Sequence, residues 1–305
     1  MQIKISFRGF KRFGLALLGL CALPAALQAQ SGGTLEKIRQ SGKVVIGVRE
    51  SSAPMAYRVS GGQREFVGYH VELCEKVLAQ IAPQAKIEYM ALTSQNTLPL
   101  IQNGTVDLGC GPTTNNQARQ KQVAFALTTY VSEVRMAVKA DSGIASFQQL
   151  AGQTVAASAG TTAVQLLRKY GKQQQIDFET LLGKDHFESF LLLSSGRARA
   201  FVLDDNLLAG VVANSPDPKG YKITGEVLGS EPIALVLRKD DPAFKQAVDQ
   251  VLAGLMRSGE LAQLYDKWFM QPIPPKNVAL NLPMGQTLKA LLENPNDKPL
   301  EEFRN

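Results

Sequence analysis

Four residues of the chain have the chemistry to hold a small charged molecule. Arg49 and Arg119 are cations, Asp204 is an acid, and His186 is one of only two histidines. An arginine pairs bidentately with a carboxylate, and an aspartate can hold an ammonium group. Such a set suits a small zwitterion with a second anionic group, provided that the fold brings the four side chains together.

Hydroxyl groups accompany these four residues. Ser94, Thr114, Ser158 and Thr161 each come soon after a short apolar run. A helix that begins beside Thr161 would add backbone N–H donors for an anion. Taken alone, each hydroxyl could simply cap a helix, and each charged residue could lie at the surface. Their shared position after predicted strands is what points to one cleft.

An alternation of strands and helices must position these residues. Strands are predicted at 44–48, 87–92, 106–110, 154–157, 176–178, 200–203 and 233–237. Helices are predicted at 69–81, 94–102, 161–169 and 185–193, and a longer one begins at Asp241-Pro242. This order indicates parallel strands with crossover helices, and ligands then bind beyond the carboxyl ends of the strands.

The alternation falls into two blocks, and 305 residues are many for a single core. Extended segments at 130–139 and 229–237 would join the blocks twice. The sequence therefore predicts an α/β fold with two lobes, each a mostly parallel sheet flanked by helices, and two hinge crossings. Lobe 1 is expected to comprise 30–132 and 233–305, and lobe 2 to comprise 133–232.

Residues 1–29 have the build of a cleavable secretory signal. A basic start without one acid precedes the apolar run 13–27, and small residues end at Ala29. A membrane anchor is the alternative, but the run is short for a bilayer span. A lipoprotein signal at Cys21 is disfavoured because the residue before it is the large Leu20. The mature chain is therefore expected to be exported.

Composition excludes several other classes of protein. Four of the 33 basic residues lie in the signal segment, which leaves 29 against 27 acidic residues. Without a basic stripe, binding to nucleic acid loses its support. Three cysteines and two histidines also exclude a zinc ribbon or a histidine-rich metal site. We therefore expect no metal and no cofactor.

Cys74 and Cys110 are the two cysteines of the mature chain. Export would allow them to form a disulfide. Burial statistics favour the simpler interpretation that each is a small core residue. The sequence leaves the question open.

The polar segments together resemble a known family. The motifs are Val48-Arg49-Glu50-Ser51-Ser52, Thr93-Ser94-Gln95-Asn96, Leu100-Ile101-Gln102-Asn103-Gly104-Thr105, Thr113-Thr114-Asn115-Asn116, Arg119-Gln120-Lys121-Gln122, Lys184-Asp185-His186, Gly196-Arg197-Ala198, Asp204-Asp205 and Lys267-Trp268-Phe269. With them, residues 34–298 resemble the periplasmic solute-binding proteins of ABC amino-acid transporters, specifically the glutamate/aspartate-binding type.

The resemblance implies a role for each residue at the α-amino-acid end of a ligand. Arg119, with Thr114 and the amide of Thr161, would bind the α-carboxylate. Asp204 would bind the α-ammonium, and Ser158 would line the wall of the smaller lobe.

At the side-chain end, the resemblance implies that Arg49, Ser94 and His186 face a second carboxylate. Two positions depart from the family pattern. Thr97 stands where the relatives usually have arginine, and Pro112 stands where they have serine. Proline keeps its carbonyl but offers neither a hydroxyl nor an amide. Glutamate or aspartate is expected as the ligand, with weak discrimination against glutamine and asparagine; a neutral or amide amino acid is the alternative.

The predicted function is that of a monomeric receptor. It closes on one amino acid and delivers it to an ABC transporter permease in the inner membrane, without making or breaking a bond. An enzyme on the same scaffold, similar to cyclohexadienyl dehydratase, is an alternative that would need Glu50 or His186 as general acid or base. A sensor that signals to a membrane kinase is a further one. No Ser-His-Asp set, phosphate loop or HExxH motif occurs.

Overall fold

The computed structural model describes residues 1–4, 33–60 and 64–303. Its helices and strands lie within Gly32–Asn305. Apart from its first four residues, the segment predicted as a signal peptide falls outside the described residues, so the cleavage site stays a prediction. Within the described ranges, no helix is long and apolar enough to cross a membrane.

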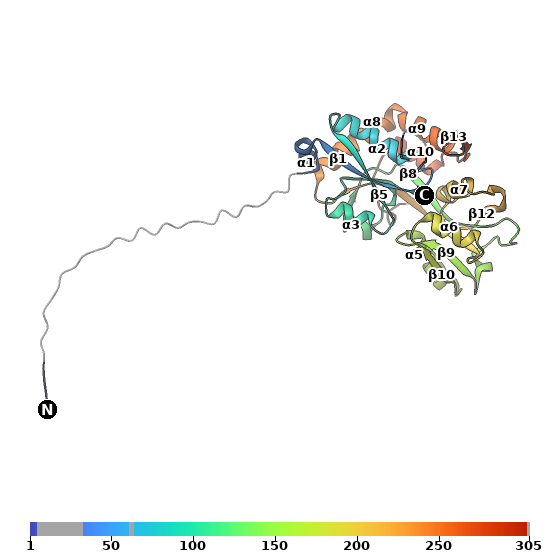
Figure 1. The fold of residues 1–305 in the computed structure, drawn as a ribbon, viewed down its shortest axis with the longest axis horizontal. Helices are drawn as coiled ribbons and strands as arrows, with labels where there is room; N and C mark the ends of the chain where they lie inside the picture. Colours follow the sequence, from blue (N-terminus) through green and yellow to red (C-terminus); the bar gives the residue numbers. More distant parts are fainter. Residues whose placement is uncertain (5–32, 61–63, 304–305) are drawn as a thin grey trace. The chain divides into compact units, whose positions relative to one another are not determined.

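One continuous sheet forms the centre of the fold (Figure 1). Its strands are β1 (Lys43–Arg49), β5 (Lys86–Leu92), β6 (Leu108–Thr114), β7 (Val123–Phe125), β8 (Tyr130–Lys139), β9 (Thr154–Ser158), β10 (Glu179–Gly183), β11 (Ala200–Asp204) and β12 (Tyr221–Arg238). They lie in the order β10-β9-β11-β8-β12-β6-β1-β5, with β7 paired to β12.

Strand direction divides this sheet into two parallel halves. On one side β1 pairs in parallel with β5 and β6, and on the other β9 pairs in parallel with β10 and β11. Strands β8 and β12 run antiparallel to each other and join the halves. The two extended crossings predicted at 130–139 and 229–237 are these two long strands.

The helices connect the strands as crossovers or cover the sheet. They are α1 (Thr34–Ser41), α2 (Tyr69–Ile81), α3 (Thr97–Gln102), α4 (Gln117–Gln120), α5 (Thr162–Gln174), α6 (His186–Ser194), α7 (Asp205–Ala213), α8 (Pro242–Ser258), α9 (Glu260–Phe269) and α10 (Gln286–Glu293), with 3-10 turns η1 (Phe147–Leu150) and η2 (Pro218–Gly220). Two small sheets are formed by β2 (Ser51–Ser52), β3 (Ala56–Arg58) and β4 (Phe66–Val67), and by β13 (Pro272–Ile273) and β14 (Val278–Ala279).

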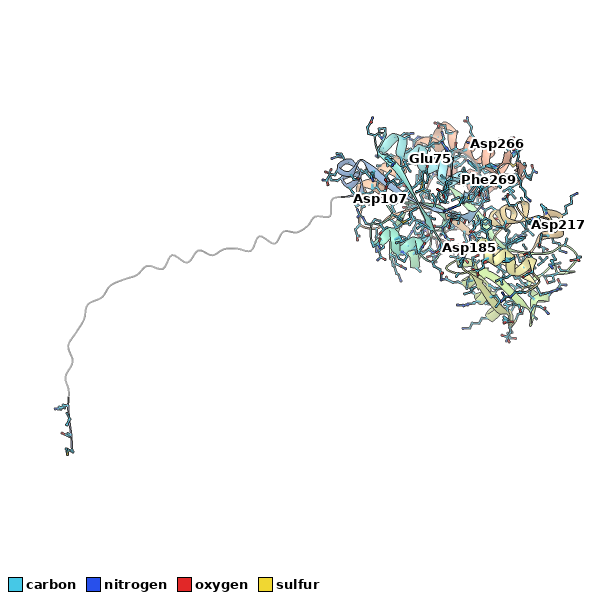
Figure 2. The ribbon with its side chains drawn as sticks, in the orientation of Figure 1. Glu75, Asp107, Asp185, Asp217, Asp266 and Phe269 are labelled. Atoms are coloured by element: carbon cyan, nitrogen blue, oxygen red, sulfur yellow. A yellow bond between two sulfur atoms is a disulfide. The ribbon has the colours of Figure 1, made fainter. Side chains whose placement is uncertain are left out.

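Side-chain caps explain where two of the predicted helices begin. Asp185, labelled in Figure 2, precedes α6 and starts this helix by accepting a hydrogen bond from the amide of Glu188 at 2.9 Å. Asp241 accepts one from the amide of Phe244 at 3.2 Å, with proline at the first position of α8.

Several predicted boundaries were wrong. The helix expected from residue 94 begins only at Thr97, because Ser94 turns its hydroxyl toward Arg49 instead of capping the helix. The strand expected at 176–178 is β10, Glu179–Gly183, and α5 reaches Gln174 rather than residue 169.

Aromatic rings attach the C-terminal helices to the first half of the sheet. Phe269 of α9 stacks on Tyr130 of β8 at 4.9 Å and on Tyr265 at 4.3 Å between ring centroids. Tyr69 of α2 meets Phe269 edge-on at 5.3 Å. Phe269 is fully buried. The chain therefore returns after β12 to pack on the half from which it started.

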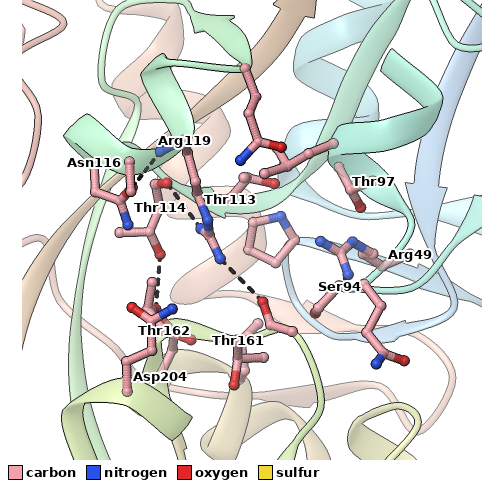
Figure 3. A pocket seen from close by; sticks show the side chains of 18 of the residues that line it. Arg49, Ser94, Thr97, Thr113, Thr114, Asn116, Arg119, Thr161, Thr162 and Asp204 are labelled. Atoms are coloured by element: carbon pink, nitrogen blue, oxygen red, sulfur yellow. Dashed lines mark hydrogen bonds between the residues drawn. The ribbon is translucent and has the colours of Figure 1, made fainter. Parts of the chain in front are cut away.

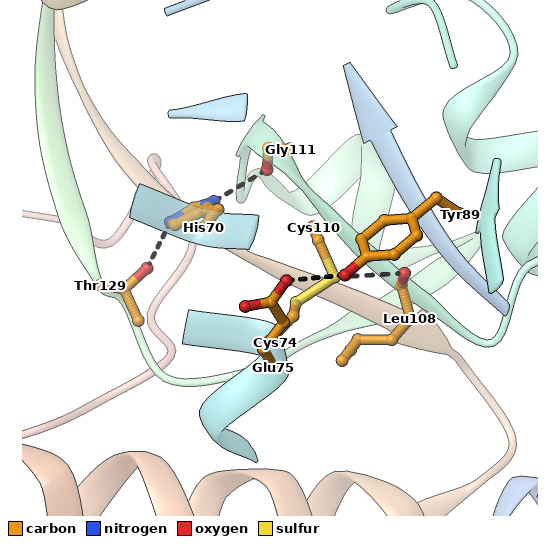
Figure 4. The surroundings of a disulfide bond; sticks show 8 residues. All are labelled: His70, Cys74, Glu75, Tyr89, Leu108, Cys110, Gly111 and Thr129. Atoms are coloured by element: carbon orange, nitrogen blue, oxygen red, sulfur yellow. Dashed lines mark hydrogen bonds between the residues drawn. A yellow bond between two sulfur atoms is a disulfide. The ribbon is translucent and has the colours of Figure 1, made fainter. Parts of the chain in front are cut away.

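A disulfide joins Cys74 of α2 to Cys110 of β6, with 6.2 Å between the Cα atoms (Figure 4). The preference for unbonded core cysteines was wrong. Helix α2 packs on β6, and this long-range contact is what brings the two residues together.

The neighbouring His70 also holds β6, since its Nδ1 lies 3.0 Å from the carbonyl oxygen of Gly111. Burial lowers the pKa of His70 to about 4, so the ring is neutral.

Candidate ligand-binding site

A cavity of about 310 Å³ lies where the two halves of the sheet meet (Figure 3). Nine of the ten predicted site residues line it: Arg49, Ser94, Thr97, Pro112, Thr114, Arg119, Thr161, His186 and Asp204. The tenth, Ser158, is not among the lining residues. A cavity of this size is at the lower end of the range for small-molecule sites.

Most of the lining residues lie at or just beyond the carboxyl ends of strands. The first half supplies Arg49 from the end of β1, Ser94 from the turn after β5, Pro112 and Thr114 from β6, and Arg119 from α4. The second half supplies Thr161 before α5, His186 at the first position of α6, and Asp204 at the end of β11. The predicted strand-end cleft is therefore present.

The guanidinium of Arg119 reaches across the cavity from one half to the other. It donates through Nη1 to the carbonyl oxygen of Thr114 at 3.0 Å and through Nη2 to that of Gly160 at 3.2 Å. Gly160 has φ of 82°, and a Cβ there would lie 2.8 Å from the backbone nitrogen of Gln95. Only glycine permits this close approach. Burial lowers the pKa of Arg119, while Glu231 and Asp204 oppose that shift.

Arg49 is the second cation of the cavity. Its Nη1 donates to Ser94 Oγ at 2.7 Å, and the residue is only 5% exposed. Burial, together with the charge of Arg119, lowers the pKa of Arg49 to about 9, so it stays charged at neutral pH. Among the described residues, neither Arg49 nor Arg119 forms an ion pair with a carboxylate. Both remain able to pair with an anionic ligand.

Asp204 supplies a carboxylate to the same cavity. Its Oδ1 accepts a hydrogen bond from Ser132 Oγ at 2.5 Å. Burial raises the pKa of Asp204, whereas the Ser132 bond and the two arginines lower it. A ligand ammonium placed here would meet a preorganised acceptor.

His186 is buried and neutral. Its Nδ1 lies 2.7 Å from Ser158 Oγ, which itself lies 2.8 Å from Ser189 Oγ. Burial and the charge of Arg49 lower the pKa of His186 to about 3. Ser158 therefore supports the imidazole through a hydrogen bond, instead of forming the cavity wall as expected.

The two residues that depart from the family pattern both face the cavity. Thr97 donates its hydroxyl to the carbonyl oxygen of Thr93 at 2.7 Å, so that proton is committed within the turn. Leu98, Pro99 and Pro112 line the cavity nearby. At the end of the cavity lined by Thr97, Leu98, Pro99 and Pro112, Arg49 is thus the cation, and these neighbours are neutral.

Sequence reasoning missed Glu231, a fully buried residue of β12. Its Oε2 accepts hydrogen bonds of 2.7 Å from both Thr114 Oγ1 and Thr162 Oγ1. Thr114 therefore spends its hydroxyl proton on Glu231, not on a ligand carboxylate. A lone acid inside 229–237, the segment predicted as an extended crossing between the blocks, was the available signal.

The proposed enzymatic acid or base is poorly placed. Glu50 forms an ion pair of 2.8 Å with Arg58, is about half exposed, and does not line the cavity. Its alternative, His186, has a pKa far below neutrality. Among the described residues, no group of His, Cys, Asp or Glu is arranged to hold a metal ion.

Residues 44–271 match the bacterial extracellular solute-binding proteins, family 3. The chain belongs to this family. The glutamate/aspartate import solute-binding protein of Escherichia coli (strain K12) is 42% identical over 284 residues, which cover 92% of each chain. The L-glutamate/L-aspartate-binding protein of Pseudomonas aeruginosa is 38% identical over 96% of this chain and 100% of the relative.

A solved structure supports the same conclusion about the fold. The crystal structure of a mutant of ArgBP from T. maritima matches with a TM-score of 0.70 at 25% identity, covering 78% of this chain and 100% of that chain. The two-lobe fold of type-II periplasmic binding proteins, predicted from the sequence, is thereby confirmed.

Proposed function

We propose that the protein is the receptor of an ABC importer for an acidic amino acid, glutamate or aspartate. It would bind the ligand in the periplasm as a monomer and deliver it unchanged to the inner-membrane permease. Two relatives that cover most of the chain bear names of glutamate/aspartate-binding proteins. The observation that carries the proposal is a cavity with two arginines, neither of which has a carboxylate partner among the described residues.

The α-amino-acid group would bind between Arg119 and Asp204. Arg119 has N–H donors in excess of its two carbonyl contacts, and these can pair with the α-carboxylate. The amide of Thr161, just before α5, donates a long hydrogen bond of 3.3 Å to the carbonyl oxygen of Ser158; it would exchange this bond for one to the ligand carboxylate, which the helix dipole favours. Asp204 would hold the α-ammonium. This end is the same for every amino acid.

The ligand side chain would extend toward Arg49. Ser94 fixes this guanidinium, and neutral His186 offers a further polar contact without adding charge. A carboxylate at this end would gain a charge-assisted hydrogen bond that an amide could not match. This difference favours glutamate or aspartate over glutamine or asparagine.

Contacts from both halves of the sheet would make ligand binding and closure one event. We assign 30–132 and 233–305 to lobe 1 and 133–232 to lobe 2, with β8 and β12 as hinges. The hydrogen bonds that span the lobes include one from Arg119 to Gly160 and one from the amide of His186 to Ser51 Oγ at 3.2 Å. A ligand touching both lobes would favour the closed state.

Calorimetry on the chain that begins at Gln30, stripped of ligand by mild unfolding and refolding, tests the proposal. Glutamate and aspartate should bind tightest among the amino acids, and the bound ligand should be recovered unchanged. At 100 times the dissociation constant, a ligand should stabilise the protein by about 2.7 kcal/mol, a readily measured thermal shift. Binding of only neutral or basic amino acids, or conversion of the ligand, contradicts the proposal.

A further inference from the structure

Glu231 joins the two walls of the cavity from the hinge. On β12 it pairs in register with Ser132 of β8, the residue that holds Asp204. Its Oε2 accepts bonds from Thr114 at the end of β6 and from Thr162 at the beginning of α5. Its Oε1, buried as well, has no hydrogen-bond partner among the described residues. Oε2 thus accepts two hydrogen bonds, and Oε1 is available for a proton.

The charged groups around Glu231 come from four elements. Arg119 of α4 favours its ionised form, and Asp204 of β11 opposes it. Farther out, Arg49 of β1 acts on Asp204, and Asp205 at the start of α7 lies beside Asp204. Asp205 is held by the amide of Glu133 in β8, at 3.1 Å.

Charge balance in the cavity depends on the ligand. With Asp204 and Glu231 both ionised, the two carboxylates match the charges of Arg49 and Arg119. An acidic amino acid then brings one unmatched negative charge into a buried site, which is costly. An amide such as glutamine brings no net charge. A single proton on one of the carboxyl groups removes the difference.

We propose that Glu231 takes up a proton from solvent at Oε1 when an acidic amino acid binds, and that it takes up none when the corresponding amide binds. This inference rests on the proposed function. The proton forms an O–H bond on the oxygen that lacks a partner, and Oε2 keeps both threonine hydrogen bonds. The hinge carboxyl group would then stay between the two walls in either protonation state.

The surroundings of the Glu231 carboxyl group support this assignment. Burial and the nearby Asp204 raise the pKa of Glu231 to about 7. An anionic ligand would raise it further. The resulting gain in affinity is therefore fully present below about pH 7 and is lost as the pH rises through the pKa of the bound state. Proton uptake on binding is largest between the pKa of Glu231 in the free protein and its pKa in the bound state.

His186 and Asp204 are weaker candidates for the same proton. The imidazole lies at the positive end of α6 and beside Arg49, which together oppose its protonation. Asp204 accepts from Ser132 and would face the ligand ammonium, so its ionised form is favoured on binding. Glu231 accepts both of its hydrogen bonds at Oε2, so Oε1 has no partner among the described residues, and Glu231 does not line the cavity that would hold the ammonium.

Calorimetry near pH 8 in buffers of different ionisation enthalpy counts the protons taken up on binding. We expect uptake approaching one proton with glutamate and almost none with glutamine. Glu231→Gln should abolish the uptake, while Glu133→Gln, a half-exposed acid on β8, should leave it unchanged. Infrared spectra of the unmodified protein should show a protonated-carboxyl band that appears on adding glutamate and not on adding glutamine.

The outcomes separate this inference from the proposed function. Glutamate binding without proton uptake overturns the inference alone. Uptake that persists in Glu231→Gln and disappears in His186→Gln also overturns it, because the imidazole is then the acceptor. A protein that binds neither ligand overturns the proposed function together with the inference that rests on it. If Glu231→Gln does not fold, the infrared spectra of the unmodified protein still test the inference, because absence of the protonated-carboxyl band with glutamate overturns it.

Discussion

The two ends of the cavity are built in different ways. At the end proposed to bind the α-amino-acid group, Arg119 is held by carbonyl groups from both halves of the sheet, and Asp204 is held by Ser132 on a crossing strand. At the side-chain end, Arg49 is held by one serine, and Thr97 satisfies its own turn. The end proposed for the group that every amino acid shares is tied to the hinge. The end proposed to distinguish amino acids takes its cation, Arg49, and Thr97 from one half alone, where a single substitution can change it.

Loss of Arg119 should have the largest effect and should weaken every ligand. Arg119→Ala would leave the α-carboxylate buried without a cation, which costs about 3–5 kcal/mol. Calorimetry should show at least a hundredfold loss for glutamate and glutamine alike. Arg64→Ala, at an exposed arginine paired with Glu75, is the matched control and should bind normally. A loss of less than tenfold would remove Arg119 from the site.

The disulfide should affect both ends together, because β6 carries residues of each. The bond closes a loop of 36 residues, and in the chain-entropy description such a loop stabilises the fold by about 4 kcal/mol. The double variant Cys74→Ala/Cys110→Ala should therefore unfold at lower denaturant concentration. Added reductant should lower the midpoint of the native protein and leave that of the variant unchanged. Equal midpoints of native and variant protein would contradict the prediction.

Removing Arg49 should change the affinity for glutamate more than the affinity for glutamine. Arg49→Gln removes one charge-assisted hydrogen bond from the side-chain carboxylate, worth about 1.5–3 kcal/mol. Glutamate affinity should fall roughly 10- to 100-fold, by the same arithmetic, while glutamine affinity changes little. Titration of both ligands against the same preparation gives the ratio. An equal loss for both would mean that Arg49 serves the α-amino-acid end.

The sequence was most informative where a general rule of the fold applied. Parallel strands place their carboxyl ends along one edge, so residues after β1, β5, β6, β9 and β11 could be expected to meet. Asp185 and Asp241 began helices as predicted because capping depends on neighbours three residues away. Such features need only local sequence or strand order.

The features that were missed depend on register and long-range packing. Glu231 reaches Thr114 and Thr162 of the cavity wall because its strand pairs with β8 at Ser132, a register that periodicity alone does not give. Ser158 reaches the cavity only through His186, and the two cysteines meet because α2 crosses β6. Even Thr114, correctly placed in the cavity, gives its hydroxyl to an acid that the sequence did not associate with it.

A substitution at Thr97 tests the difference between the two ends of the cavity by adding a charge instead of removing one. Its side chain is buried at the cavity wall, and the turn uses its hydroxyl, so the position contributes no charge to the ligand. Thr97→Arg would add a second cation beside Arg49. We expect glutamate to bind roughly 10- to 100-fold tighter, corresponding to one further charge-assisted bond of about 1.5–3 kcal/mol.

Glutamine should bind the same Thr97→Arg variant no better or more weakly, because two neighbouring guanidinium groups repel without a carboxylate between them. Thr97→Gln is the matched control, since it adds length without charge and should not favour glutamate. Calorimetry with both ligands measures the ratio for each variant. If Thr97→Arg instead loses glutamate, the threonine leaves room for a larger or neutral side chain. The α-amino-acid end would then keep its assignment, and the acidic ligand would not.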